Sequence, residues 1–252
     1  MQIEILKKYW KSEEAIAHIQ GWDFSHISGK YSVENDLPWN YKNVINSYLK
    51  DTDSLLDIDT GGGEFLLSLN HHNNKLSATE AYPPNVKLCN ETLLPLGINF
   101  REANNYASLP FEDAVFDVVI NRHGRYDIDE LYRILKPDGL FITQQVGEDN
   151  ERELVELLLS GTEKTFCGMN LKEQSAKFSD KGFRILKSDE AFRPILFFDI
   201  GALVWFAKII EWEFPGFSVD TCFDRLLLAQ DILNIEGVIK GNIHRYFIVA
   251  QK

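Results

Sequence analysis

Short apolar runs alternate with segments of helical spacing along most of the chain. The runs with strand character are residues 55–59, 76–80, 98–102, 116–121, 136–146 (with a turn at its start), 183–186 (extending toward 192) and 244–250. The segments with helical spacing are residues 3–20 (ended by Gly21), 40–50, 64–69, 85–94, 128–135, 151–159, 171–181, 200–210 and 221–235. This alternation predicts an α/β fold with a doubly wound, mostly parallel sheet.

A glycine turn follows the first expected strand, in the stretch S-L-L-D-I-D-T-G-G-G-E-F-L-L-S-L (residues 54–69). Strand, glycine turn and helix form the opening unit of nucleotide-binding sheets, where a ligand can approach bare backbone and the N–H groups of the helix start. The stretch has Leu66 where a dinucleotide turn has its third glycine, and it lacks the lysine of a P-loop. A tight turn in another kind of α/β protein is the alternative.

The charges around this turn are acidic. Asp57, Asp59 and Glu64 surround it, and the first basic residue after it is Lys75. Three carboxylates make a poor place for a pyrophosphate. They suit a ligand with a cationic centre, an amino group and ribose hydroxyls, and S-adenosylmethionine has all three.

The turn resembles motif I of the class I S-adenosylmethionine-dependent methyltransferases, which reads acidic-x-G-x-G-x-G. Asp57, Gly61 and Gly63 match the motif, Thr60 lies between them, and Asp59 stands in place of the first glycine. In the family, that glycine lets the methionine end of the cofactor lie against backbone. The resemblance therefore implies that Asp59 either crowds S-adenosylmethionine or pairs with its amino group.

Two later stretches extend the resemblance. Glu80 ends the second expected strand about 20 residues after the turn, where an acidic side chain meets ribose hydroxyls, and it matches motif II. A solvated strand-end charge is its alternative. The stretch L-P-F-E-D-A-V-F-D-V-V-I-N (residues 109–121) is also similar to the family, which implies adenine contacts at Asn105 and Tyr106. The implied cofactor-binding residues are Asp57, Asp59, Thr60, Gly61, Gly63, Glu80, Ala81, Asn105, Tyr106 and Asn121.

The resemblance is strong over residues 50–150 and rests on topology elsewhere. It implies a seven-stranded, Rossmann-like sheet with an antiparallel last strand and a helical, aromatic cap. Residues 1–50 are expected to form part of that cap, and residues 51–252 the methyltransferase domain, with a cap insertion at about 193–240. The aromatic loop at residues 22–41 lines a pocket entrance or is strapped across the sheet edge; both alternatives stay open.

The loop after the fourth strand, residues 122–127, is expected to face the transferred methyl group, because ligands bind beyond the carboxyl ends of strands. His123 is the candidate base, since its ordinary pKa suits proton acceptance near neutrality; a surface histidine is the alternative. Tyr126 is a second candidate catalytic residue that orients substrate. Asp127 either does the same or caps the next helix. The two arginines of this loop are candidates for reading an acidic substrate group.

The composition of the chain limits the classes of binding partner that we expect. The net charge of −12, without a basic run, disfavours a nucleic-acid partner. The sequence contains no run of about 20 apolar residues, so we expect no membrane span. The first residues lack the features of a signal peptide. Cys89, Cys167 and Cys222 read as free thiols of a reducing cytoplasm, with no C-x-x-C metal pair.

Three functions are compatible with these features. The first is a methyltransferase that uses S-adenosylmethionine and acts on a small-molecule acceptor. The second is an RNA methyltransferase, although the four-cysteine zinc module of the ribosomal-RNA guanine enzymes is missing. The third is a non-catalytic binding protein that retained the fold, for which Asp59 is the direct hint. The acceptor and the oligomeric state are not predicted.

Overall fold

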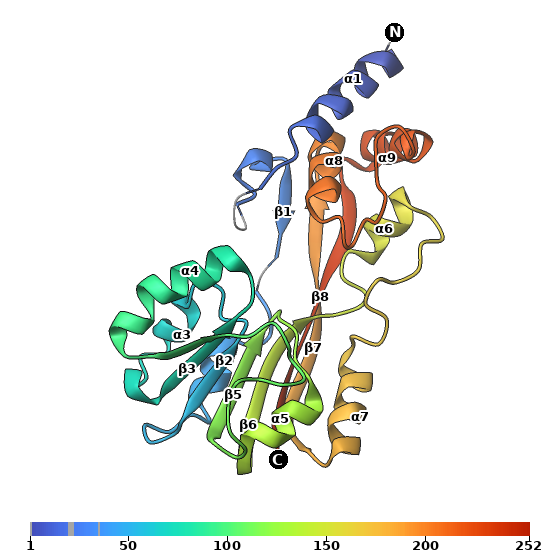
Figure 1. Ribbon diagram of the computed structural model, residues 1–252. Helices are drawn as coiled ribbons and strands as arrows, with labels where there is room; N and C mark the ends of the chain where they lie inside the picture. The colour runs from blue at the N-terminus through green and yellow to red at the C-terminus, as the bar shows by residue number, and fades with distance from the viewer. Residues whose placement is uncertain (1, 20–22, 35) are drawn as a thin grey trace. The chain divides into compact units, whose positions relative to one another are not determined.

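The computed structural model describes residues 2–19, 23–34 and 36–252, which form two compact units (Figure 1). The helical unit comprises Met1–Leu37, Glu148–Cys167 and Phe192–His244, and the sheet unit comprises Pro38–Gly147, Gly168–Ala191 and Arg245–Lys252. Every residue expected from the sequence to bind cofactor or to act in catalysis lies in the sheet unit.

The sheet confirms the predicted fold class. Its strands are β1 (Tyr31–Val33), β2 (Leu55–Ile58), β3 (Leu76–Glu80), β4 (Asn99–Glu102), β5 (Phe116–Arg122), β6 (Leu135–Val146), β7 (Arg184–Phe197) and β8 (Ile239–Gln251), hydrogen-bonded in the order β1-β7-β8-β6-β5-β2-β3-β4. Strands β2 to β6 pair in parallel, and the last strand, β8, is antiparallel to β6. Strand β1 is the eighth strand, beyond the seven expected.

The strand order reverses between β2 and β5. From β2 the chain adds β3 and β4 on one side, then returns to place β5 on the other side of β2. The register pairs Leu55 with Val118 and Ile58 with Asn121, so the two strands end side by side. In open α/β sheets this switch point is where ligands bind, beyond the carboxyl ends of the strands.

Helices cover both faces of the sheet unit. Helices α2 (Tyr41–Asn46), α3 (Glu64–Ser68) and α4 (Pro83–Thr92) share a hydrophobic cluster with Leu55, whereas α5 (Ile128–Ile134) and α7 (Leu171–Lys181) share another with Leu56 and Ile58. Figure 1 shows α3 and α4 beside β3. Because alternate residues of β2 enter different cores, all four of its residues are buried, and the strand reads as a continuous apolar run.

The helical unit has its own core. Helices α1 (Gln2–Ala15), α6 (Arg152–Leu158), α8 (Ile200–Ile209) and α9 (Phe223–Glu236) pack around it, and residues 200–207 of α8 are all buried. This burial explains the aromatic, apolar composition of that stretch. Over the part of the chain that the structure describes, no helix has both the length and the apolar character needed to cross a membrane.

The structure corrects several predicted boundaries. Helix α1 ends at Ala15 rather than residue 20, and Gly21 lies outside the described residues. Within the aromatic loop, Tyr31–Val33 forms β1, paired antiparallel with Ile195–Phe197, so this part adopts the sheet-edge alternative. Strands β7 and β8 are much longer than expected, because exposed polar residues within them interrupt the apolar pattern while strand pairing continues.

Candidate functional site

Three loops meet at the carboxyl ends of the strands, and Asp59 joins them. Asp59 follows β2, Arg125 follows β5, and Tyr106 follows β4. The Tyr106 hydroxyl donates to both carboxylate oxygens of Asp59 at 3.0 Å, and the Arg125 backbone N–H donates to Asp59 Oδ2 at 3.1 Å. The carboxylate therefore links the loops on both sides of the switch point.

The Asp59 side chain is held in a position that only a small neighbour permits. Its backbone has φ +55°, in the left-handed region that favours glycine. A Cβ on Gly124 would lie 2.7 Å from Asp59 Cβ, so Gly124 leaves the space that the carboxylate uses. Burial raises the pKa of Asp59, while its bonds from Arg125 N–H and Tyr106 oppose that rise. Gly124 was missed in the sequence, where it is one loop glycine among many.

Asp57 lies beneath the turn rather than at its surface. The residue is 4% exposed, and Thr60 Oγ1 donates to Asp57 Oδ2 at 2.7 Å. Burial raises the pKa of Asp57 to about 7, against the lowering effects of the Thr60 bond and of the Arg122 charge. Asp57 and Thr60, both expected at the cofactor, are thus placed as internal supports of the glycine turn.

Glu80 holds the glycine turn from the end of β3. Its carboxylate accepts from the backbone N–H of Gly61 at 2.8 Å, of Ala81 at 2.8 Å and of Tyr82 at 2.9 Å. Asn85 Nδ2 adds a fourth bond at 3.3 Å. Glu80 is 6% exposed, so the alternative of a solvated charge is wrong. Four bonds occupy the usual acceptor sites of an ionised carboxylate.

The glycine turn leaves bare backbone at one position and packs tightly at another. At Gly61, φ is +64° and nothing lies within 4 Å of the place a Cβ would take. At Gly63, φ is +86° and a Cβ would lie 2.7 Å from Leu93 Cδ2. Gly63 therefore serves helix packing, whereas Gly61 leaves room for a ligand to approach the backbone.

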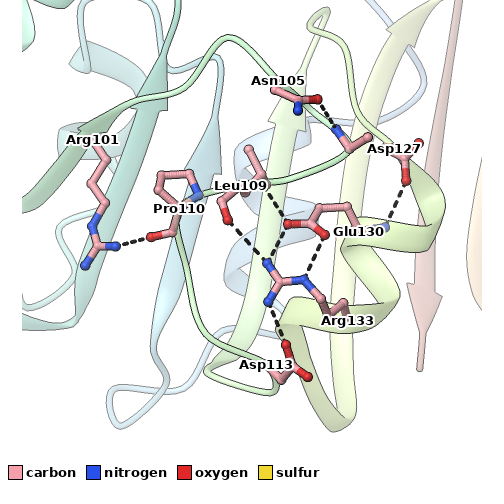
Figure 2. A network of polar contacts seen from close by, with 9 residues as sticks. Arg101, Asn105, Leu109, Pro110, Asp113, Asp127, Glu130 and Arg133 are labelled. Atoms are coloured by element: carbon pink, nitrogen blue, oxygen red, sulfur yellow. Dashed lines mark hydrogen bonds and ion pairs between the residues drawn. The ribbon is translucent and has the colours of Figure 1, made fainter.

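The two asparagines expected at the cofactor have different surroundings. Asn105 is exposed, and its Oδ1 accepts from Ala107 N–H at 3.2 Å (Figure 2). Asn121 is fully buried: its Nδ2 donates to the Ile58 carbonyl at 2.9 Å, and its Oδ1 accepts from Gln145 at 2.6 Å. Asn121 thus ties the end of β5 to the end of β2, and its Nδ2 also donates to the Arg125 carbonyl of the following loop at 3.5 Å.

His123 stands at the end of β5 with φ +61°. Its N–H donates to the Gln144 carbonyl at 2.9 Å. The protein around the imidazole, with the positive charges of Arg245 and Arg122, lowers the pKa of His123 below its ordinary value, although the residue as a whole is exposed. The ring is therefore neutral at pH 7 and a weaker base than the ordinary histidine assumed from the sequence.

Tyr126 is placed in the core beside α7. Its ring centroid lies 5.0 Å from that of Phe141 and 5.9 Å from that of Phe178, and its hydroxyl donates to Gln174 Oε1 at 3.3 Å. Burial raises the pKa of this hydroxyl. These contacts direct the ring into the core, so a role in positioning the loop suits it better than contact with a substrate.

A second acidic group, in α5, holds the loop that carries Tyr106. Figure 2 shows Glu130 and Arg133 beneath that loop. Glu130 is 5% exposed; its Oε1 accepts from Leu109 N–H at 2.6 Å and pairs with Arg133 Nη2 at 2.6 Å. Arg133 Nη1 also pairs with Asp113 at 2.7 Å. We call Leu109, Asp113, Glu130 and Arg133 the Glu130 clamp.

The clamp was missed in the sequence, although its signal is present there. Glu130 and Arg133 have the i, i+3 spacing of a helical ion pair, but spacing alone does not show that the loop lies on that helix face. Asp127 Oδ1 accepts from Glu130 N–H at 2.9 Å, so the interpretation of Asp127 as a helix cap is confirmed. The clamp and the cap together fix two of the loops that meet at Asp59.

Comparisons with known proteins agree with this geometry. Residues 56–143 match the family model of a methyltransferase domain. A candidate methyltransferase from Bacillus halodurans C-125 superposes with a TM-score of 0.56 at 14% identity, covering 84% of this chain and 98% of that one. The YcgJ protein from Bacillus subtilis gives 0.54 at 18% identity, with 84% and 97% covered.

A geranyl diphosphate methyltransferase in complex with S-adenosylmethionine gives a TM-score of 0.51 at 13% identity, covering 83% of both chains. At such identities these structures establish the fold alone. No curated protein matches the sequence significantly. Residues 56–143 therefore match a methyltransferase-domain family, and the chain has the Rossmann-like fold of the methyltransferase structures that superpose on it.

Proposed function

We propose that the protein is a methyltransferase that uses S-adenosylmethionine and acts on a small-molecule acceptor. The observation that carries the proposal is the set of carboxylates at the switch point of a methyltransferase domain. Asp59 and Glu80 flank the open backbone of Gly61, and neither carboxylate lies within 4.0 Å of a Lys or Arg side-chain nitrogen among the described residues. A cationic ligand suits this arrangement, because it would compensate the negative charges.

The residues present fit such a cofactor. Nothing lies within 4 Å of the place that a Cβ on Gly61 would take, and Asp59 offers negative charge beside it. The bond from Asn85 is the longest of the four to Glu80, so it is the one that a ribose hydroxyl can replace. Asn105, exposed beside Tyr106, offers an amide to the adenine edge.

When bound, S-adenosylmethionine supplies a methyl group on a positively charged sulfur, which becomes a neutral thioether as the acceptor gains the methyl group and loses a proton. The protein's share is to align the acceptor and exclude water. His123 is the proposed proton acceptor: it is neutral at pH 7, and its lowered pKa restricts it to acceptors that lose their proton readily. Tyr126 positions the loop that carries it.

One observation favours a second candidate, a binding protein with this fold that transfers no methyl group. The Asp59 side chain stands where the motif has a glycine, and its bonds to Tyr106 and Arg125 close the switch point across two loops. A ligand that needs that space must move the Asp59 carboxylate. Binding of the cofactor without turnover on any acceptor would favour this candidate.

The deciding experiment is isothermal calorimetry with S-adenosylmethionine and with S-adenosylhomocysteine, followed by a crystal soak with the latter. We expect both to bind and to raise the melting temperature. The Gly61→Val variant, which places a branched side chain on the open backbone, should lose both responses; because Val also strains the positive φ of this position, circular dichroism must show that the variant is folded. No binding of either ligand to the unmodified protein at millimolar concentration would overturn the proposal.

The acceptor class rests on charge. A net charge of −12 opposes a nucleic-acid acceptor, and retention of RNA at low salt would contradict the small-molecule assignment. A cap formed by residues 1–50 and 193–240, and a cytoplasmic location, stay predictions.

A further inference from the structure

We infer that Asp59 makes the switch-point site prefer the cationic form of its ligand, so that S-adenosylmethionine binds more tightly than its neutral thioether product. The inference rests on the proposed function and adds a specificity role to one residue. It concerns Asp59, the position at which this chain departs from motif I and carries a charged side chain in place of glycine.

The first support is the kind of donor that surrounds Asp59. Its three hydrogen bonds come from the Tyr106 phenol, at 3.0 Å to each oxygen, and from the Arg125 peptide N–H at 3.1 Å. These donors carry no formal charge. Among the described residues no Lys or Arg side-chain nitrogen lies within 4.0 Å of the carboxylate, and the guanidinium of Arg125 acts on it only from a longer distance.

The second support is the sign of the neighbouring charges. Glu80 lies close enough to oppose ionisation of Asp59, and Asp59 in turn opposes ionisation of buried Asp57. Three carboxylates thus share one end of the sheet: Glu80 raises the cost of charging Asp59, and Asp59 and Glu80 both raise the cost of charging Asp57. A cation bound among them relieves this repulsion, whereas a neutral ligand leaves it in place.

The third support is the position of the side chain. Asp59 directly follows β2 at the switch point, and its carboxylate reaches across to the loop after β5. A ligand bound beyond these strand ends therefore meets the carboxylate. S-adenosylmethionine and S-adenosylhomocysteine share the adenosine and amino-acid groups and differ by a methyl group and the positive charge on sulfur. Discrimination by Asp59 would consequently help the product to leave after transfer.

The test compares dissociation constants for the two ligands by calorimetry in the unmodified protein, Asp59→Asn and Asp59→Gly. In both variants we expect the preference for the cationic ligand to fall about tenfold. Asp59→Gly suits the positive φ of the position and guards against a misfolded asparagine variant. Circular dichroism confirms the fold of each.

Asp53→Asn is the matched control, because Asp53 precedes the start of β2 whereas Asp59 follows its end. It removes the same charge from the other end of the strand, and the preference should stay unchanged. If both ligands bind and their ratio is unaltered in the Asp59 variants, the inference is wrong and the proposed function stands. If neither ligand binds the unmodified protein, both are wrong.

Discussion

The sheet unit holds two groups of buried carboxylates that differ in their partners. Glu130 is 5% exposed and contacts the guanidinium of Arg133 at 2.6 Å. Asp57 and Glu80 are buried to a similar degree, at 4% and 6% exposed. Their hydrogen bonds come from a hydroxyl, peptide N–H groups and an amide. The two groups are therefore buried to a similar degree, and they differ in whether a cationic side chain contacts the carboxylate.

The difference separates a carboxylate that is neutralised within the fold, Glu130, from two that are not, Asp57 and Glu80. When a buried carboxylate contacts a guanidinium group, the attraction between the charges offsets the cost of removing them from water. Removing one partner leaves the other buried charge without that attraction and lowers stability. A buried carboxylate without a cation lowers stability, as the raised pKa of Asp57 shows. A protein that retains such a group has kept a cost to folding, and a cationic ligand is one benefit that offsets it.

The largest expected effect is on the Glu130 clamp. Glu130→Ala should lower the free energy of unfolding by about 3–5 kcal/mol, because it leaves Arg133 half-buried without its main partner and frees the Leu109 N–H. Urea denaturation measures the change. Arg133→Ala should cost a similar amount, and the double variant less than the sum of the two. Additive losses would show that the pair acts independently.

The next effect concerns binding. Glu80→Gln should weaken S-adenosylmethionine by about 100-fold, because the amide NH₂ group cannot accept from the N–H groups that order the Gly61 turn. Calorimetry measures the loss. The control is Glu102→Gln: Glu102 is the exposed partner of Glu80 in the β3–β4 register. Equal binding by the two variants would remove Glu80 from the site.

Replacing Asp57 should raise the free energy of unfolding, whereas replacing Glu130 should lower it. Its folded pKa is about 7, above its unfolded value of about 4, so the native state holds the proton more tightly. Stability should fall as pH rises from about 4 to 7 and then level off. Asp57→Asn lacks this fall and should be more stable by about 1–3 kcal/mol above pH 7.

Urea midpoints between pH 5 and pH 9 test this behaviour of Asp57. The gain from Asp57→Asn should shrink steadily toward acid pH, since the protonated aspartic acid and the asparagine are then both uncharged. A gain of the same size at every pH would mean that Thr60 packing, and not charge burial, sets the effect.

The smallest expected effect comes from Tyr106→Phe, which removes one uncharged donor to Asp59. The loss in unfolding free energy should be about 0.5–1.5 kcal/mol, and thermal denaturation is sufficient to measure it. Tyr82→Phe is the control, since Tyr82 is 61% exposed, and its loss should be close to zero. A large loss at Tyr106 would show that the Asp59 contact holds the fold.

Much of the sheet unit was predictable from local spacing. The structure places β3 at Leu76–Glu80 and α7 at Leu171–Lys181, the bounds expected from apolar periodicity. In each element the side chains on one face recur with the period of a strand or of a helix, and this recurrence can be recognised in the sequence. The position of Glu80 after the glycine turn followed in the same way, because one strand–helix–strand unit has a nearly constant length.

Contacts between distant residues were beyond such reasoning. No residue near Tyr106 in the chain indicates that Asp59, 47 residues away, is its hydrogen-bond partner. The clamp likewise depends on a loop returning to α5, and β1 depends on an edge of β7 that forms far along the chain. Contacts between residues that are far apart in the chain leave no periodic pattern in the sequence.

Residue order was sufficient to predict the α/β alternation, the glycine turn with its acidic surroundings, and the carboxylate at the end of β3, because these follow from backbone geometry over short spans. Which carboxylates are neutralised depends instead on how the folded chain packs. Arg133 reaches Glu130, whereas Asp59 is held by a phenol and a peptide N–H. Charge compensation depends on distances of a few ångströms between loops, and only the packed chain sets those distances.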